Sequence, residues 1–176
     1  MKKIDVTDWK KFELASLFDV VLSKGDIQAK LTPEGDIPLI SSGKFNNGVC
    51  KYISEGDGKA QIFEGNVITT DMFGKSFYQS KNFYAVSHGR VNILLPKFTM
   101  SKNTAAFIVG VMDASFSLKY SVSGMCNQKV LQKEHLFLPK NSDGNPDFAY
   151  MESYMKGIME KQRANLDVLQ MILIGC

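Results

Sequence analysis

The C-terminal segment constrains the fold most, because its residue pattern predicts one long helix. From Phe148 onward there is no proline, and apolar residues recur at steps of three or four. This spacing lines the apolar residues along one face of a helix, which we expect to be roughly 27 residues and about 40 Å long. Pro139 and Pro146 interrupt the chain just before it, and Asn145 or Asp147 can cap its first turn.

A helix of this length has more apolar surface than one small domain can cover. We therefore expect part of its apolar face to pair with a helix of another chain, as in a coiled coil. The alternative is a terminal helix that folds back onto its own domain. Methionines suit an adaptable interface, but they are equally common in ordinary cores. The residues expected at the helix interface are Met151, Met155, Ile158, Met159, Leu166, Leu169 and Leu173.

Short strands are predicted for the middle of the chain. Its apolar or alternating runs are bounded by turn residues, and they read VCKYI, AQIF, NVITT, SFYQS, FYAV, RVNILLP and HLFLP. Residues 9 to 22 predict a lead strand with a helical turn, and residues 37 to 40 predict a short strand among loops. We interpret AAFIVGVM as a helix, although its residues fit a strand as well.

Together these elements predict an α+β fold. The sequence has 176 residues, of which 44% are hydrophobic and 22% charged, values typical of a folded globular protein. We expect a compact, β-rich domain with a few helices over residues 1 to 145. The long helix follows over residues 146 to 176, so the chain is one domain with an appended helix.

The sequence shows no pattern for catalysis, metal binding or a cofactor. Cys50, Cys126 and Cys176 are widely spaced and form no CxxC pair, and neither His88 nor His135 belongs to a catalytic motif. The stretch EGDGKAQIFEG does not match a P-loop, and it predicts a hairpin turn instead. We therefore expect a protein that is not an enzyme, with no catalytic residue, no metal and no cofactor.

Charge and the N-terminal residues give weaker constraints. The net charge of +3 is compatible with a polyanionic partner but does not require one. Asp5, Asp8 and Glu13 fall where a secretory signal would need apolar residues. No apolar run approaches the roughly 18 residues that span a bilayer. We expect a cytoplasmic protein that does not enter a membrane.

Several segments, taken in order, resemble the target-recognition half of the specificity (S) subunit of type I restriction-modification systems. The first places Trp9, Phe12, Leu14, Leu17 and Phe18 in a W-x-x-F-x-L-x-x-L-F pattern. The others are GDIPLISSGKFNNGV at 35 to 49, GNVITTDMFGKSFYQSKNF at 65 to 83, HLFLP at 135 to 139 and PDFAYMESYMKGI at 146 to 158. Each segment alone is little more than a strand with a turn. Their succession over residues 9 to 160 carries the resemblance.

The resemblance implies a protein that binds DNA and catalyses no reaction. In that family the globular unit reads one half of a split site in double-stranded DNA, and the helix pairs with another helix to set the distance between the halves. The subunit holds an adenine methyltransferase (modification) subunit, and in some assemblies a restriction subunit, on the DNA. The usual S subunit has two recognition units, whereas this sequence has one. We favour an antiparallel homodimer, with a fragment or a separately encoded second half as alternatives.

Loops between the short strands carry the side chains expected to contact DNA. Between residues 20 and 103 there are ten Lys and Arg against seven Asp and Glu. Hydroxyl, amide and ammonium groups donate to phosphates, and Asn and Lys also read base edges. The candidates are Ser41, Ser42, Lys44, Asn46, Asn47, Lys75, Ser76, Tyr78, Lys102 and Asn103.

Two other classes of protein stay open at this point. Each candidate loop residue can instead be a turn residue chosen for its backbone geometry, as Asn-Asn-Gly at 46 to 48 is. The chain would then be a protein-interaction domain unrelated to DNA. The third possibility is a fragment of a small DNA-modifying enzyme. NPDF at 145 to 148 is similar to a methyltransferase motif that holds a flipped base, but Asp147 replaces its second proline, so we interpret it as a helix cap.

Overall fold

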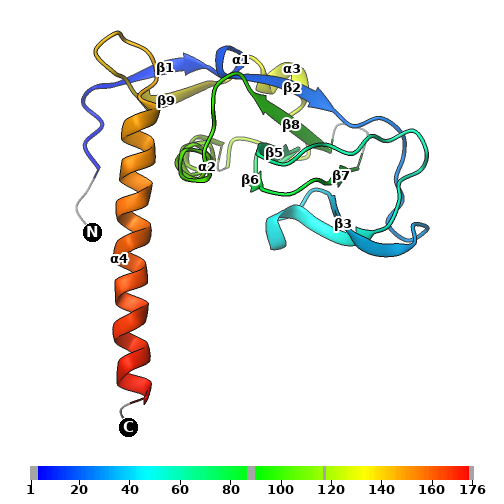
Figure 1. The fold of residues 1–176 in the computed structure, drawn as a ribbon. Helices are drawn as coiled ribbons and strands as arrows, with labels where there is room; N and C mark the ends of the chain where they lie inside the picture. Colours follow the sequence, from blue (N-terminus) through cyan, green and yellow to red (C-terminus); the bar gives the residue numbers. More distant parts are fainter. Residues whose placement is uncertain (1–3, 87–89, 117, 175–176) are drawn as a thin grey trace.

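The computed structural model describes residues 4–86, 90–116 and 118–174, without the side chains of residues 172 to 174. The expected α+β class is confirmed (Figure 1). In chain order the strands are β1 (Trp9–Glu13), β2 (Phe18–Leu22), β3 (Glu34–Ile40), β4 (Val49–Ile53), β5 (Val67–Asp71), β6 (Ser76–Gln79), β7 (Tyr84–Ala85), β8 (Val91–Pro96) and β9 (His135–Pro139). The helices are α1 (Leu14–Leu17), α2 (Lys102–Phe116), α3 (Gln128–Leu131) and α4 (Phe148–Ile174), with a 3-10 turn η1 (Asn46–Gly48).

A four-stranded antiparallel sheet, in the order β2-β8-β5-β6, lies at the centre of the domain. Successive side chains of a strand point to opposite faces, so this sheet contributes to two cores. Ile68 and Leu94 enter one core with α2 and the start of α4. Val67 and Ile93 enter a second core against β3 and β7. Because both faces of this sheet are covered, every residue of β5 is buried.

A second sheet, in the order β4-β3-β7, covers one face of the central sheet. β3 and β4 form an antiparallel pair, and β7 runs parallel to β3. Residues 60 to 63 were expected to form a strand, but they contribute only an isolated bridge between Phe63 and Phe83. The stretch around them is also not a hairpin turn, because β4 and β5 belong to different sheets.

The opposite face of the central sheet is covered by α2 and by the two-stranded sheet β1-β9. The helix expected from AAFIVGVM is confirmed within α2. Its buried residues Ala105, Ile108 and Met112 follow the three-and-four spacing of a helix that covers a core on one side. Leu136 and Leu138 alternate inward from β9 onto the same core.

The long helix α4 is confirmed with the predicted length and cap. In its first turn, the amide of Tyr150 donates to Asp147 Oδ1 at 2.8 Å. The Phe148 ring stacks on Phe98 with centroids 4.0 Å apart, and Glu152 accepts a hydrogen bond from Asn103 Nδ2 at 2.7 Å. Met151 is fully buried in this core. The expectation that Met151 meets another chain is therefore wrong, because its own domain covers it.

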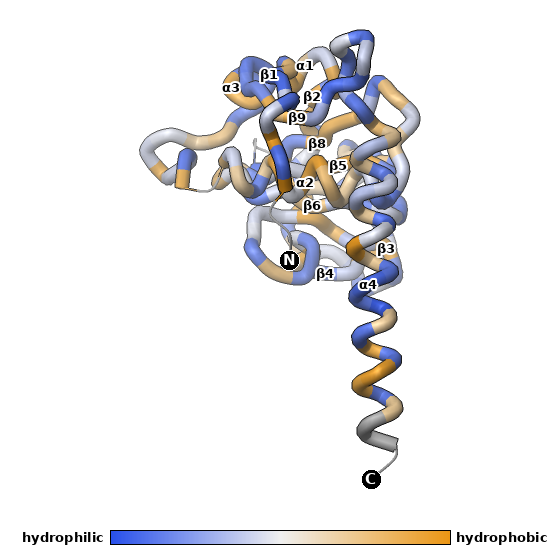
Figure 2. The backbone as a smooth tube through the Cα atoms, turned by 90° about the vertical axis from the view of Figure 1, so that its left-hand side faces the viewer, coloured by the Kyte–Doolittle hydropathy of each residue, from blue (hydrophilic) through white to orange (hydrophobic). Residues whose placement is uncertain are grey.

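Beyond Ile158, α4 leaves the domain and projects into solvent (Figure 1). Every residue from 159 to 171 is exposed, and apolar positions continue along this projecting half (Figure 2). The exposed fractions of Leu166 and Leu169 are 59% and 55%. The side chain of Leu173 lies outside the described residues. Within the part of the chain that the structure describes, no helix combines the length and hydropathy needed to cross a membrane.

Candidate nucleic-acid interface

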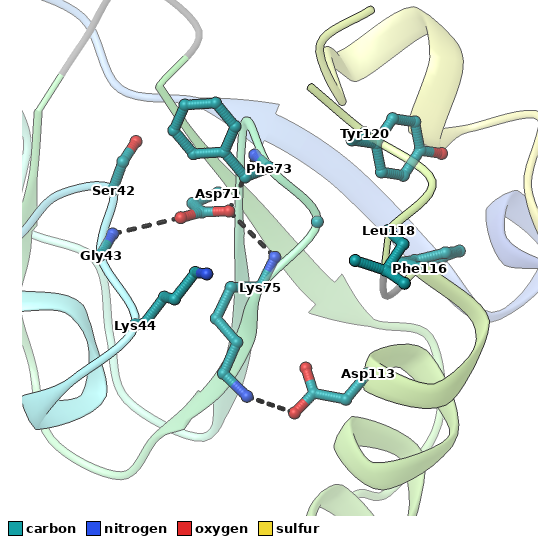
Figure 3. A pocket seen from close by; sticks show the side chains of 11 residues that line it. Ser42, Gly43, Lys44, Asp71, Phe73, Lys75, Asp113, Phe116, Leu118 and Tyr120 are labelled. Carbon is teal, nitrogen blue, oxygen red and sulfur yellow. Dashed lines mark hydrogen bonds and ion pairs between the residues drawn. The ribbon is translucent and has the colours of Figure 1, made fainter. Parts of the chain in front are cut away.

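A hollow of about 770 Å³ opens on the face of the domain where three segments meet (Figure 3). The segments are the loop after β3, the turn between β5 and β6, and the C-terminal end of α2 with the residues that follow it. Among the predicted residues, Ser42, Lys44 and Lys75 line this hollow. Packing of the β4-β3-β7 sheet on the central sheet therefore places side chains more than thirty positions apart around one space.

Asp71 connects two of these segments. Its side chain is only 5% exposed. One carboxylate oxygen accepts the amide of Gly43 at 3.1 Å, and the other accepts the amides of Phe73 and Lys75 at 2.9 Å each (Figure 3). Hydrogen bonds from amides to a charged acceptor are stronger than neutral ones. Asp71 thus fixes the loop that carries Lys44 against the turn that carries Lys75.

The two lysines differ in their surroundings. Lys75 forms an ion pair with Asp113 of α2, and each side chain is about one-third exposed. Its ammonium also lies 5.2 Å from the centre of the Phe77 ring. Lys44 is exposed, and no ion pair is recorded for it among the residues that the structure describes. Lys44 is therefore the cation of the hollow that is most readily available to an anionic ligand.

Arg90 lies at the same edge, although the sequence analysis does not place it there. Its carbonyl accepts a hydrogen bond from Ser42 Oγ at 2.9 Å, and its backbone also accepts the amide of Met72 at 3.1 Å. The Arg90 side chain is exposed. The contact with Ser42 brings a third cation close to the loop that bears Lys44. His88, two residues earlier, lies outside the described residues.

Hydrogen bonds to backbone atoms hold the loop between β3 and β4 in shape. Asn46 and Asn47 both have positive φ, 50° and 52°, as the predicted turn requires. Gln79 Nε2 donates to the Asn47 carbonyl at 2.9 Å, and the Ser41 amide donates to Gly48 at 2.8 Å. Asn46 and Asn47 are exposed at the tip, beside Lys44.

The remaining predicted residues lie away from this hollow. Ser76 is fully buried, and its hydroxyl contacts that of Thr70 at 2.9 Å, so it is inaccessible to DNA. Tyr78 is partly buried and donates to Asn66 Oδ1 at 3.0 Å. Lys102 and Asn103 lie at the N-terminal end of α2, about 16 Å along the helix from Asp113. The expectation that Ser76 contacts DNA is therefore wrong, whereas for Tyr78, Lys102 and Asn103, which do not line the hollow, DNA contact stays a prediction.

Apolar side chains complete the rim. Leu118 is fully exposed and has a φ of 64°, which is unusual for leucine, and Phe73 is 39% exposed. Tyr120 lies behind them, and its hydroxyl donates to Glu134 at 2.6 Å. Burial, together with the carboxylate of Glu134, raises the Tyr120 pKa, so this phenol stays protonated. It contributes a fixed wall to the hollow and no acid-base chemistry at neutral pH.

The geometry offers cations, amides and apolar groups, a combination suited to binding. Among the described residues, no three His, Cys, Asp or Glu side chains are grouped as a metal site would need. Burial raises the pKa of the Cys126 thiol to about 12, which keeps it protonated and weakly nucleophilic. Such an arrangement can hold a polyanion and read base edges.

A family model described as "Type I restriction modification DNA specificity domain" matches residues 7–168. The chain belongs to this family. Among curated proteins, this specificity domain is 25% identical over 165 residues to the protein named "Type II restriction enzyme BgcI specificity subunit S.BcgI" of Heyndrickxia coagulans. The match covers 92% of this chain and 46% of that protein, so the chain spans about half the length of its relative.

Solved structures of the family share the fold. The S subunit of a type I restriction-modification system from M. genitalium aligns with a TM-score of 0.58 and 13% identity, over 94% of this specificity domain and 44% of that chain. The HsdS subunit from Thermoanaerobacter tengcongensis aligns with a TM-score of 0.58 and 14% identity, over 96% and 41%. At these identities the likeness concerns the fold alone.

Proposed function

We propose that this chain recognises a sequence in double-stranded DNA as the specificity component of a restriction-modification system, and that it performs no chemistry itself. The observation that carries the proposal is the loop bearing Lys44, Asn46 and Asn47. Asp71 and Gln79 fix its backbone, while the exposed Lys44 side chain lines the hollow and has no ion pair with another described residue. A loop whose backbone is already fixed loses little entropy on binding, which favours sequence recognition.

The side chains that line the hollow, together with the exposed Asn46, Asn47 and Arg90 of neighbouring segments, each have a role in this proposal. Lys44, Lys75 and Arg90 neutralise phosphates or donate to guanine, and Asn46 and Asn47 have the amide groups that pair with adenine. Leu118 and Phe73 provide apolar surface for a thymine methyl group. Membership of the specificity-domain family supports this assignment over a protein-interaction domain with no nucleic-acid role.

Salt dependence tests the proposed DNA contact. Neutralising a phosphate makes affinity fall with salt, with a slope of about 0.9 per contact. The double variant Lys44→Glu/Lys75→Glu should bind duplex DNA more weakly and lower the salt slope by about two. Lys11→Glu, which reverses the charge of one exposed lysine on β1, serves as the control. Equal affinity and slope for the parent and the double variant would exclude the hollow as the DNA contact.

We infer further that two copies pair through α4 and so present two recognition domains to a split site. The charged residues Lys156, Glu160, Arg163 and Asp167 recur at steps of four and three on one side of α4. Leu166 and Leu169 lie on the other side, so the projecting half is amphipathic although its own domain does not cover it. Pairing with a second copy would cover the apolar side of both helices and leave the charged sides in solvent.

Light scattering tests the pairing. The wild-type chain should be dimeric at micromolar concentration, and Leu166→Asp/Leu169→Asp should be monomeric because charges would enter the apolar stripe. Arg163→Asp, on the charged side, should stay dimeric. A monomer under all conditions would exclude the homodimer and leave pairing with a different helix.

The proposed partners are an adenine methyltransferase subunit and, beside it, a restriction subunit, on DNA in the cytoplasm. The chain alone should methylate no DNA in the presence of S-adenosylmethionine. A methyltransferase encoded beside it should modify a defined sequence only when the chain is added. Methylation or cleavage by the isolated chain would overturn the non-catalytic assignment.

A further inference from the structure

A second hollow, which we call the α2 groove, lies where α4 joins the domain. It measures about 490 Å³ and opens between the N-terminal segment, the outer side of α2 and the first turns of α4. Aromatic side chains form its walls: Trp9 lies 5.6 Å from Phe107 and 5.9 Å from Phe137 between ring centres, and Phe107 lies 5.7 Å from Tyr154. Among the described residues that line the groove, none is charged.

The α2 groove is continuous with the apolar side of α4. Met155 lines the groove and is partly buried against the core, and Ile158 follows it one turn later on the same side of the helix. Leu169 comes 18 residues after Met151, about five full turns, so it faces the same way as that buried residue. The stripe that leaves the domain therefore begins inside the groove.

The direction of a symmetric partner helix decides what it would place there. In an antiparallel pair, the projecting half of one α4, which carries Leu166 and Leu169, runs along the first turns of the other α4. Those first turns contribute Tyr154 and Met155 to the groove. In Figure 1, α2 is viewed along its axis beside this part of α4.

We propose that the α2 groove receives Leu166 and Leu169 from α4 of a second copy of this chain. Each domain then covers the far end of the other copy's helix, and the aromatic walls bury side chains that are 59% and 55% exposed in one copy. This inference rests on the proposed homodimer and adds the surface that fixes its register. Two contacts related by symmetry fix both the overlap of the helices and the distance between the two recognition domains.

Gly110 allows a sharp test, because it lines the groove and a Cβ added there would meet no atom within 4 Å. Gly110→Leu should therefore leave the fold of one copy intact, and it raises helix propensity. Its side chain would occupy the space of the incoming leucine. We expect the dissociation constant of the dimer to rise at least about tenfold, measured by analytical ultracentrifugation, with no fall in melting temperature at concentrations where the protein is monomeric.

Gly157→Leu is the matched control, because Gly157 also has open space and lies on α4 away from the apolar stripe. It should leave the dissociation constant unchanged. If Gly110→Leu dimerises as tightly as the wild type, the groove assignment is wrong while helix pairing stands. If the wild type itself is monomeric, the pairing proposal fails and this inference fails with it.

A disulfide cross-link provides positive evidence. In a chain with Cys50 and Cys176 changed to serine, Gly110→Cys combined with Leu169→Cys should form a covalent dimer under mild oxidation. Gly58→Cys combined with Leu169→Cys should not, because Gly58 lies in the loop between β4 and β5, away from α2. Equal cross-linking in both pairs would show random collision and contradict the proposed register.

Discussion

Asp71 illustrates how one buried carboxylate can fix the backbone of a proposed binding surface. It accepts three backbone amides that belong to two segments of the hollow. Asp71→Ala leaves those amides without their acceptor, so we expect a loss of about 2 kcal/mol in the free energy of unfolding, measured in urea. DNA affinity should fall as well, because the loop with Lys44 loses its position.

Asp57 offers a control for this prediction. It also accepts backbone amides, those of Asp26, Lys59 and Ala60, but it lies in the loop between β4 and β5. Asp57→Ala should lower stability without a specific loss of DNA affinity at temperatures where both variants are folded. Equal affinity in the Asp71 and Asp57 variants would mean that the loop conformation does not matter for binding.

Leu118 combines full exposure with a backbone conformation that leucine avoids. A left-handed conformation costs a residue with a Cβ about 1 kcal/mol. Leu118→Gly should therefore raise the melting temperature, while DNA affinity falls because an apolar contact is lost. Leu118→Asn should also raise the melting temperature, because asparagine tolerates this conformation. A rise in stability with unchanged affinity would remove Leu118 from the proposed interface.

Sequence reasoning found some of the individual residues of the site and missed others for physical reasons. Lys44 and Lys75 were predicted because loop cations are visible in a sequence. Ser76 was misplaced because the sequence does not reveal which side of its strand faces the core. Asp71 is not among the predicted residues, although its place at the end of a buried strand, before a Gly-Lys turn, is a usable signal.

Among the elements, α4 depends on a charged contact at the point where it meets α2. Hydrogen bonds from Ser101 and Asn103 lower the pKa of Glu152 below its ordinary value of 4.5. A lowered carboxyl pKa stabilises the folded state above the unfolded pKa, and this contribution is lost as pH falls through the folded-state pKa. The attachment of α4 should therefore weaken on acidification below about pH 4.5.

Glu152→Gln tests this pH dependence. Chemical unfolding of the variant should change less between pH 6 and pH 3 than unfolding of the wild type, because one group with a lowered pKa is gone. Glu160→Gln, on the projecting half of α4, should retain the wild-type slope. An identical pH profile for wild type and Glu152→Gln would mean that this contact contributes nothing to folding.

The elements were more predictable than their arrangement. The periodicity of α4 and its Asp147 cap are local signals, and both are confirmed. The run at residues 60 to 63 has the composition of a strand, but only Phe63 finds a bridge partner, so the run stays irregular. Pairing of β1 with β9, or β2 with β8, joins distant segments and depends on packing that local patterns do not contain.

At the scale of the whole molecule, the projecting half of α4 should be separable from the recognition domain. A chain truncated after Glu160 keeps the residues of α4 that pack on the core. It should fold as a monomer and bind a duplex with one half-site as well as the full chain does. On a duplex with two half-sites it should lose the gain from divalent binding, about a hundredfold or more in titrations.

The two duplexes separate the possible outcomes. Equal loss on both would mean that the truncation damaged the recognition domain. No loss on either would mean that α4 does not couple two domains on DNA. The truncation also tests the predicted boundary between a domain at residues 1 to 145 and a helix at residues 146 to 176. The first turns of α4 pack on the core of the domain, so a separate role of the helix stays a prediction for its projecting half.

The bare apolar stripe of α4 has a consequence for the life of the protein in a cell. Newly made copies expose Leu166 and Leu169 until another helix covers them. Chaperones and proteases act on exposed apolar segments of this kind. Copies without a partner helix should therefore be removed faster than paired ones, and pulse-chase labelling of the wild type and of Leu166→Asp/Leu169→Asp would measure the two lifetimes.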